Sequence, residues 1–151
     1  MHDFVIPEGL PEFIQDHVKR YLESDGADGH WWDSRPHGGD GVVPTLLLTA
    51  TGRKTGLSRT LPIGYTEHES AYVIVGSKGG APTHPAWFLN LEANPEVSIQ
   101  VGSDRFEARA RAAVGDERAQ LWLGIVTKSP VMQTYQDGTD REIPVVILER
   151  V

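Results

Sequence analysis

The chain has 151 residues, of which 39% are apolar, a formal net charge of -7 and no cysteine. This length suits one domain with a buried core, and the lack of cysteine excludes a disulfide framework and a thiolate metal site. The acidic excess argues against a general nucleic-acid binder, and no stretch reaches the ~18 apolar residues that a membrane-spanning helix needs.

The predicted elements begin with one amphipathic helix within residues 10–26, whose apolar side chains form a single stripe: Phe13, Ile14, Val18, Tyr21 and Leu22. A glycine-rich loop with Trp31 and Trp32 follows it. Short strand-like runs bounded by turn signals then occupy residues 42–51, 59–66, 71–76, 97–102, 105–114 and 143–151. Two further helices are expected at 84–95 and 115–128.

The connections between these strands are mostly short, which favours antiparallel pairing, and a closed or nearly closed barrel would remove exposed sheet edges. The alternating strand and helix rhythm of a doubly wound sheet is missing. The sequence therefore predicts a mainly β (α+β) fold with peripheral helices. In this organisation residues 1–41 form a helix and loop packed on a barrel domain of residues 42–151.

The N-terminus has neither the basic start nor the apolar run of a signal peptide, so we expect a cytoplasmic protein. Peripheral attachment to a membrane through the first helix is the alternative. That helix mixes acidic and basic side chains, with Lys19 and Arg20 beside Asp16 and Glu23. This mixture differs from a basic membrane-binding helix, and docking of the helix onto the barrel is favoured.

Positive charge is concentrated in the middle of this acidic chain. Residues 41–91 contain four Lys/Arg and only two acids, and the cations stand in glycine-rich turns. The turn GRKTG and the strand after it carry Arg53, Lys54 and Arg59, and the turn GSKGGAP carries Lys78 before a helix. Such turns and helix N-termini bind anions, so two of them predict a phosphate-bearing cofactor with a planar head. A solvated hairpin tip with arbitrary charges is the alternative for the first turn.

These stretches resemble the deazaflavin (coenzyme F-420)-dependent nitroreductase family. The resemblance runs through LLLTATGRKTGLSRTLPIGY, VIVGSKGGAPTHPAWFLNLEANPEVSIQVG, ARARAAV and YQDGTDREIPVVILE, and covers about residues 42–151. It implies a split β-barrel, of the kind found in pyridoxamine-oxidase-like and FMN-binding-like proteins, in which the strands present a flat head group to the substrate.

By position, the resemblance implies a cofactor site built from both turns and their neighbours: Arg53, Lys54, Thr55, Arg59, Thr60, Pro62, Ile63, Gly64, Val75, Gly76, Ser77, Lys78, Gly79, Pro85, Ala86, Trp87 and Phe88. Arg53, Lys54 and Thr55 would meet the glutamate tail and the phosphate, and Arg59 would pair with the phosphate. The residues implied on the substrate side, as candidate catalytic residues, are Tyr65, Ser77 and Tyr135.

The resemblance implies an enzyme in which reduced coenzyme F-420 gives a hydride to a small-molecule acceptor, namely an activated alkene, a quinone or a nitro compound. An FMN-dependent oxidoreductase of similar barrel fold and a non-catalytic carrier of deazaflavin or another anionic ligand are the alternatives. We expect no nucleic-acid partner and no integral membrane association, and both a monomer and a homodimer stay open.

The six histidines lack the spacing of a zinc site, so no metal is expected. His84 is expected to cap the helix that follows it, with a catalytic role as the alternative. The two adjacent tryptophans are expected to pack on the barrel, with a lid over the site as the alternative. In the polar loop that contains Tyr135, Asp140 and Arg141 are expected to pair and pin the loop.

Overall fold

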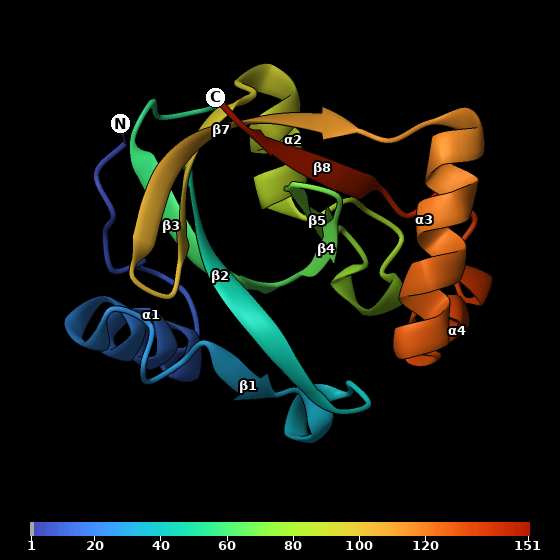
Figure 1. Ribbon diagram of the computed structural model, residues 1–151, viewed down its shortest axis with the longest axis horizontal. Coiled ribbons are helices and arrows are strands. Elements are labelled where there is room, and N and C mark those ends of the chain that lie inside the picture. Colours follow the sequence, from blue (N-terminus) through green and yellow to red (C-terminus); the bar gives the residue numbers. More distant parts are fainter. Residues whose placement is uncertain (1) are drawn as a thin grey trace.

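The computed structural model describes residues 2–151 and shows a barrel-like antiparallel sheet with helices around it (Figure 1). The strands are β1 (Trp31–Asp33), β2 (Val42–Thr51), β3 (Ser58–Gly64), β4 (Thr66–His68), β5 (Ala71–Val75), β6 (Glu96–Val101), β7 (Asp104–Ala112) and β8 (Val145–Arg150). The helices are α1 (Glu12–Ser24), α2 (Ala86–Ala93), α3 (Gly115–Lys128) and α4 (Val131–Asp137), with the 3-10 turns η1 (Arg35–His37) and η2 (Lys78–Gly80). The prediction of a mainly β, split-barrel fold is confirmed. Among these described helices, none is long and apolar enough to cross a membrane.

The sheet is one antiparallel ribbon that curls on itself. Its strand order is β1-β2-β6-β7-β8-β5-β4, and β3 pairs with β2 outside this path. Tyr65 joins β3 directly to β4, so the chain connects the two ends of the ribbon. Within residues 2–151, β3 pairs with β2 alone. The barrel is therefore open along the edge of β3 that faces away from β2.

The core forms because the strands alternate between a buried and an exposed face. In β7, Phe106, Ala108 and Ala110 are buried while the residues between them are exposed, as the sequence predicts. The other long strands turn apolar side chains into the same cluster, among them Leu46, Leu48, Ile74, Ile99 and Leu148.

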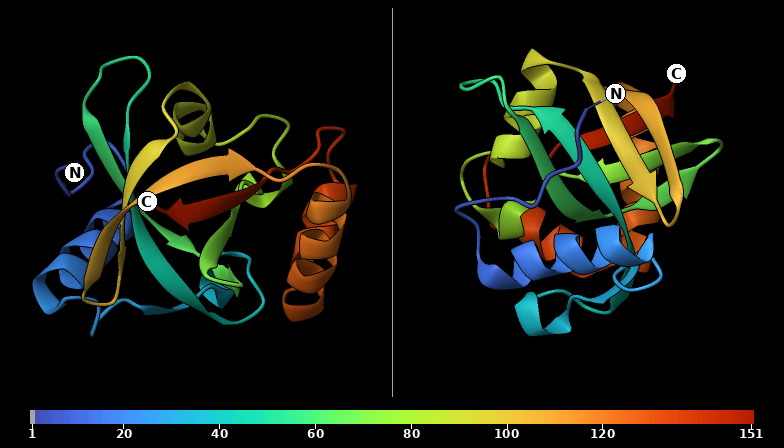
Figure 2. Two further views of the ribbon diagram at one scale, coloured as in Figure 1. Left: turned by 45° about the horizontal axis from the view of Figure 1, so that its top comes forward. Right: turned by 90° about the vertical axis from the view of Figure 1, so that its left-hand side faces the viewer.

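Helix α1 docks on the barrel through its apolar stripe. Val18 and Tyr21 are fully buried. The Tyr21 hydroxyl donates to the carbonyl of Thr45 (2.9 Å) and accepts from the N–H of Gly102 (2.8 Å). After the helix, Gly26 has a φ of 82°, and a Cβ there would lie 2.5 Å from the Cα of Gly102, so this approach requires glycine. Helix α1 and the α3–α4 pair stand at opposite ends of the barrel (Figures 1 and 2).

Three short elements, β1, most of β4 and α4, are absent from the sequence-based prediction, which treats these segments as loops or turns. The amide side chain of Gln136 in α4 donates to the carbonyl of Arg141 (2.7 Å) and accepts from the N–H of Ile143 (2.9 Å). Next to β1, the N–H of Thr45 donates to the carbonyl of His30 (2.6 Å). Elements of three and seven residues carry too little periodicity to be recognised, and long-range bonds of this kind stabilise them.

Candidate active site

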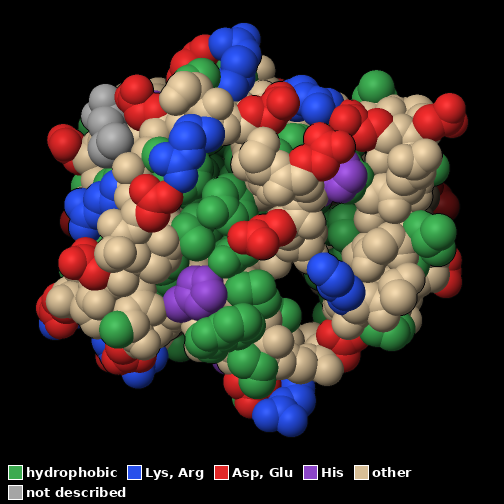
Figure 3. All heavy atoms as spheres, viewed as in Figure 1, with side chains coloured by type: hydrophobic (Ala, Val, Ile, Leu, Met, Phe, Trp, Pro, Cys, Tyr) green, Lys and Arg blue, Asp and Glu red, His purple; other side chains and the backbone are tan. Residues whose placement is uncertain are grey.

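One large groove opens on the face of the barrel that Figure 3 shows, where hydrophobic side chains gather around a hollow. Its volume is about 1010 Å³. The walls come from α1, the segment that runs from His30 through β1 and η1 to the start of β2, the ends of β3 and β5, the η2 turn, α2 and the α3–α4 junction. Pockets for small molecules and cofactors measure roughly 300–1,000 Å³, so this groove has room for a planar head group and a second reactant beside it.

The η2 turn forms one rim of the groove with a left-handed backbone. Lys78, Gly79 and Gly80 have φ angles of 46°, 62° and 82°. A lysine in this region is strained, and such strain is common at ligand-binding turns. A Cβ at Gly79 would meet nothing within 4 Å, whereas one at Gly80 would lie 2.8 Å from the carbonyl oxygen of Tyr135. The turn is therefore packed against α4 on one side and leaves its backbone open on the other.

Arg141 holds the η2 turn from behind. Its guanidinium donates to four acceptors around that turn: the carbonyls of Gly76 (3.1 Å), Ser77 (2.7 Å) and Ala81 (2.7 Å), and Nδ1 of His84 (3.0 Å). A guanidinium presents several donors in a fixed plane, so this one side chain sets the path of the backbone from both ends of the turn.

Two expectations for this region are wrong. Arg141 does not pair with Asp140, because its donors are taken by the η2 carbonyls. His84 does not cap α2, which begins without a side-chain cap. Its ring instead accepts the bond from Arg141 and packs edge-on against Phe88, with 5.0 Å between the ring centroids.

The β2–β3 hairpin lies beside α2, on the side away from the η2 turn (Figure 2). The backbone N–H and the guanidinium of Arg53 both donate to Oδ1 of Asn90 in α2, at 3.0 and 3.2 Å. The guanidinium of Arg59 donates to the hydroxyl of Thr55 (3.3 Å). Helix α2 therefore connects the two glycine-rich turns that the sequence singles out.

The four cations of these two turns, called the turn cations below, are Arg53, Lys54, Arg59 and Lys78. Within residues 2–151 none of them forms an ion pair. The partners that they do have are neutral, as in the bond from Lys78 Nζ to the Thr83 hydroxyl (3.2 Å). Cations without carboxylate partners suit a ligand that brings its own phosphate and carboxylates.

The structure brings most of the residues predicted for the site together. Those that line the groove are Pro62, Ile63, Gly64, Tyr65, Val75, Ser77, Lys78, Gly79, Trp87 and Tyr135. Those outside its walls form the hairpin or flank η2 and the start of α2: Arg53, Lys54, Thr55, Arg59, Gly76, Pro85 and Ala86. The roles of these residues toward a ligand stay predictions.

Two predicted wall residues have side chains turned away from the groove. Thr60 is fully buried, because β3 alternates its faces; its hydroxyl lies 2.8 Å from that of Thr49 and accepts from the N–H of Val5 (2.9 Å). Phe88 lies in the barrel core, since the inner face of α2 covers that core. Neither side chain lines the groove.

The two predicted tyrosines both reach the groove, and each hydroxyl has a partner from the N-terminal loop. The Tyr65 hydroxyl lies 2.8 Å from Nε2 of His30, and the Tyr135 hydroxyl donates to the carbonyl of Gly38 (2.7 Å). Burial raises the pKa of Tyr65 to about 12, so this hydroxyl is neutral at physiological pH. The loop is also tied to the α3–α4 junction, where Ser129 donates to Asp40 (2.9 Å). Sequence reasoning missed His30 and this loop, since neither carries a motif.

The adjacent tryptophans have different surroundings. Trp32 is stacked between the rings of His17 and His37, at centroid distances of 6.0 and 5.2 Å. Its ring therefore packs against α1 and η1, whereas packing on the barrel is expected from the sequence. Trp31 is 67% exposed and lines the rim of the groove.

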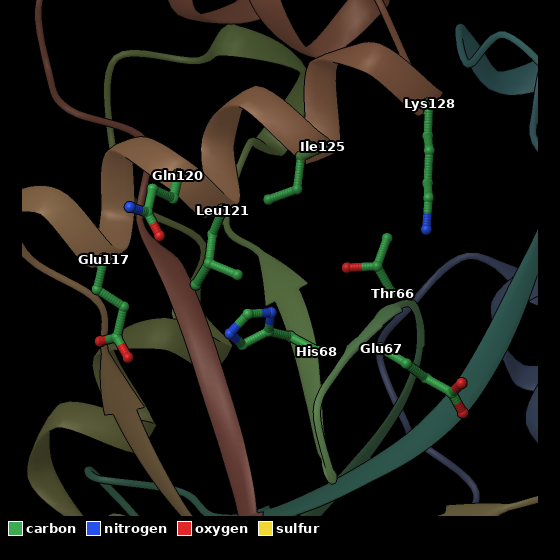
Figure 4. Close-up of a pocket in the computed structure, with 9 residues that line it drawn as sticks. Thr66, Glu67, His68, Glu117, Gln120, Leu121, Ile125 and Lys128 are labelled. Carbon is green, nitrogen blue, oxygen red and sulfur yellow. The ribbon is translucent and has the colours of Figure 1, made fainter.

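A smaller pocket of about 160 Å³ lies next to the groove, between β4 and α3. Figure 4 shows His68 pointing toward Leu121, and Lys128 extending toward Thr66. Thr66 and Lys128 line both spaces, so this pocket is a side chamber of the groove. Within residues 2–151, no group of three or more His, Asp or Glu side chains could hold a metal ion.

A split barrel with a flat-walled groove, a glycine turn at its rim and uncompensated cations beside it defines a redox protein that binds a planar coenzyme with an anionic tail. Comparison with known sequences then gives the family. Residues 13–150 match the family described as F420H(2)-dependent quinone reductase, and the chain belongs to it.

Curated relatives and solved structures agree with this family. An F420H(2)-dependent quinone reductase of Mycobacterium tuberculosis is 43% identical over 113 residues, which cover 73% of this chain and 76% of that protein. A solved F420-H2 dependent reductase is 43% identical, with a TM-score of 0.65 over 70% of this chain and 94% of its own. Another solved structure, a domain-swapped dimer, is 37% identical, with a TM-score of 0.67 over 89% of this chain and 96% of its own.

The protein is therefore a deazaflavin-dependent oxidoreductase, and its cofactor is reduced coenzyme F-420. The resemblance noted from the sequence is confirmed, and the FMN alternative is not favoured. The residues present fit this coenzyme, because the open backbone of Gly79 and the turn cations offer donors to an anionic tail. Apolar walls that include Ile63 and Trp87 suit a flat head group.

Proposed function

We propose that this protein reduces quinones, with reduced coenzyme F-420 as the hydride donor. The names of curated relatives, F420H(2)-dependent quinone reductases, support this acceptor class. The observation that carries the proposal is that η2 and the two tyrosines line one groove. A head group at η2 and a planar acceptor beside it would then share a single partly desolvated space.

In this function each part of the chain has a separate task. The turn cations bind the anionic tail, and Arg141 holds the η2 backbone in the shape that receives the cofactor. The bound cofactor supplies the hydride, so the protein needs no nucleophile of its own. The groove walls would orient the acceptor and exclude water, and Tyr65, Ser77 and Tyr135, which line the groove, would bond its oxygen atoms through their hydroxyls.

The test is an anaerobic reaction of the protein with reduced coenzyme F-420 and a short-chain quinone. The reaction is monitored through the rise in absorption of the oxidised deazaflavin. We expect one hydroquinone for each cofactor oxidised, and no comparable turnover with reduced FMN. A nitro compound and an activated alkene are tested in parallel as other acceptors. Tight cofactor binding without turnover of any acceptor would instead make the protein a carrier.

We also propose that the protein forms a homodimer. The support is the 37% identical solved structure that is a domain-swapped dimer and covers 89% of this chain. Light scattering coupled to size exclusion measures the mass directly. A mass near 33 kDa, twice the 16.6 kDa of one chain, would support the dimer, and 16.6 kDa at all concentrations would contradict it.

A further inference from the structure

The two tyrosine hydroxyls in the groove differ in what they can exchange with their partners. Tyr135 donates its proton to the carbonyl of Gly38, which can only accept a hydrogen bond. Tyr65 faces Nε2 of His30 at 2.8 Å, and an imidazole nitrogen can accept a proton or return one. Tyr65 is therefore the groove tyrosine whose partner can replace a proton that its hydroxyl gives away.

The surroundings keep Tyr65 in its neutral, proton-bearing form. Burial is the main cause of its raised pKa, and the nearby negative charge of Glu67 and the hydroxyls of Tyr72 and Tyr21 act in the same direction. The hydroxyl therefore holds its proton across the physiological pH range while its ring lines the groove.

His30 is half-buried and faces few other charged groups. Its ring meets Trp31 edge-on at a centroid distance of 5.0 Å and faces Tyr65 at 6.0 Å. The nearest histidine from α1, His17, has its own Nε2 bonded to the carbonyl of Gly29 (2.7 Å). The charged side chains that line the groove around this pair are Asp40, Glu67, Lys78 and Lys128.

The imidazole of His30 is not needed to anchor its loop. The backbone carbonyl of His30 already accepts from the N–H of Thr45 (2.6 Å), and the next three residues pair with β2 in the β1 ladder. The side chain is thus directed at Tyr65 by a backbone that is held independently. This arrangement suits a chemical role better than a structural one.

We propose that His30 and Tyr65 deliver the proton that completes reduction of the acceptor. The inference rests on the proposed function, because a quinone that gains a hydride becomes a hydroquinone anion and needs one proton. The O–H bond of Tyr65 breaks as the anionic oxygen takes that proton. The N–H bond at Nε2 of His30 breaks in turn and restores the tyrosine. Nδ1 of the same ring takes a proton from water as this bond breaks, so the imidazole stays neutral and the hydroxide that forms carries away the negative charge of the hydroquinone anion.

The test compares Tyr65→Phe and His30→Gln with the wild type at saturating reduced cofactor. General acid catalysis contributes about 10²–10⁴-fold, and we expect turnover to fall by about that amount in Tyr65→Phe and by at least about tenfold in His30→Gln. Cofactor affinity should stay within about twofold in both. His2→Gln, the same change at a histidine that bonds Ser98 and Thr51 and lines neither the groove nor its side chamber, is the matched control and should leave turnover unchanged.

The double variant supplies a further readout that separates proton delivery from packing. The double variant should be no slower than Tyr65→Phe alone, because both residues act in one step, whereas independent structural effects would multiply. Multiplying losses in the double variant would overturn the proposal.

A measurement without cofactor completes the test. Nitrogen-15 shifts of the histidine rings report which nitrogen carries the proton, and those of His30 should change in Tyr65→Phe while those of His68 should not. No change at His30 would show that the pair does not share a proton. If the wild type reduces no quinone at all, the proposed function fails first, and that outcome is distinct from normal turnover without any effect of His30→Gln.

Discussion

The arginines of the β6–β8 face and the turn cations differ in their partners. On the sheet face, Arg111 bonds both Glu117 (2.6 Å) and Glu149 (2.7 Å), Arg150 bonds Asp104 (2.6 Å), and Arg109 pairs with Glu96. At the two glycine-rich turns the cations contact only neutral groups such as Asn90 and Thr55 within residues 2–151. On the sheet face each of these three arginines has an acidic partner, whereas the positive charge of the two turns stays available to bind a ligand.

This difference matters because the protein as a whole is acidic. With a net charge of -7, the long-range field does not attract an anionic coenzyme, so binding must come from close contacts at the turns. The acids are kept away from those contacts. In residues 41–91 the only ones are Glu67 and Glu69, and both stand at or beside β4.

The largest effect should come from removing turn cations. We expect Lys54→Ala combined with Arg59→Ala to weaken binding of coenzyme F-420 by about 100-fold, because each charge-assisted bond contributes about 1.5–3 kcal/mol. The loss should shrink as salt rises, since the interaction is with exposed charges. Fluorescence titration of the deazaflavin at low and high salt measures both effects.

The matched control for this double variant is Arg109→Ala combined with Arg150→Ala on the paired face. It removes the same net charge but no turn cation, and cofactor affinity should change by less than about twofold because distant charges are screened. Equal losses in the two double variants would show that overall charge, rather than the turns, holds the tail.

A smaller effect is expected for Arg141, which bonds the backbone around the η2 turn. Arg141→Met removes the guanidinium that donates to three carbonyls and to His84. We expect the free energy of unfolding to fall by about 1–3 kcal/mol and cofactor affinity to fall by about tenfold, because the η2 turn loses its shape. Urea denaturation and the same titration measure these changes.

Arg141→Lys sharpens this test. Lysine keeps the charge but cannot span four acceptors with one ammonium group. Cofactor affinity close to that of Arg141→Met would indicate that the shape of the η2 turn matters. Cofactor affinity close to wild type would indicate that charge alone is needed, and would contradict the role of Arg141 in holding that turn.

The smallest effect belongs to the paired face. Hydrogen bonds from Arg111 hold the pKa of Glu117 below its usual value, so this pair stabilises the fold above the usual carboxyl pKa and ceases to do so as pH falls through the lowered one. Arg111→Met should therefore lower the Tm by about 1–3 °C at pH 7, and this loss should shrink progressively as pH falls below the usual carboxyl range. Calorimetry over a series of acidic pH values measures this, and a loss that stays equal at every pH would assign the effect to packing.

Much of the fold could be predicted because it is encoded locally. The alternation of β7 and the apolar stripe of α1 both appear in the sequence with the period of their structure, and both are observed. The helix α4 could not be predicted, since its seven residues depend on Gln136 bonding a segment that follows the helix. The expectation that His84 caps α2 is wrong for a related reason. Nδ1 of its ring accepts a hydrogen bond from Arg141, which is distant in the sequence.

The long strands, the two glycine-rich turns and the kind of ligand that they suit could be predicted from the amino-acid sequence, because periodicity, glycine and charge act over a few neighbouring residues. The folded barrel was needed to show which cations lack an acidic partner, that Arg141 shapes the η2 turn, and that His30 meets Tyr65. Those contacts join residues 35 to 65 positions apart, and such pairings depend on how the barrel closes rather than on any local pattern.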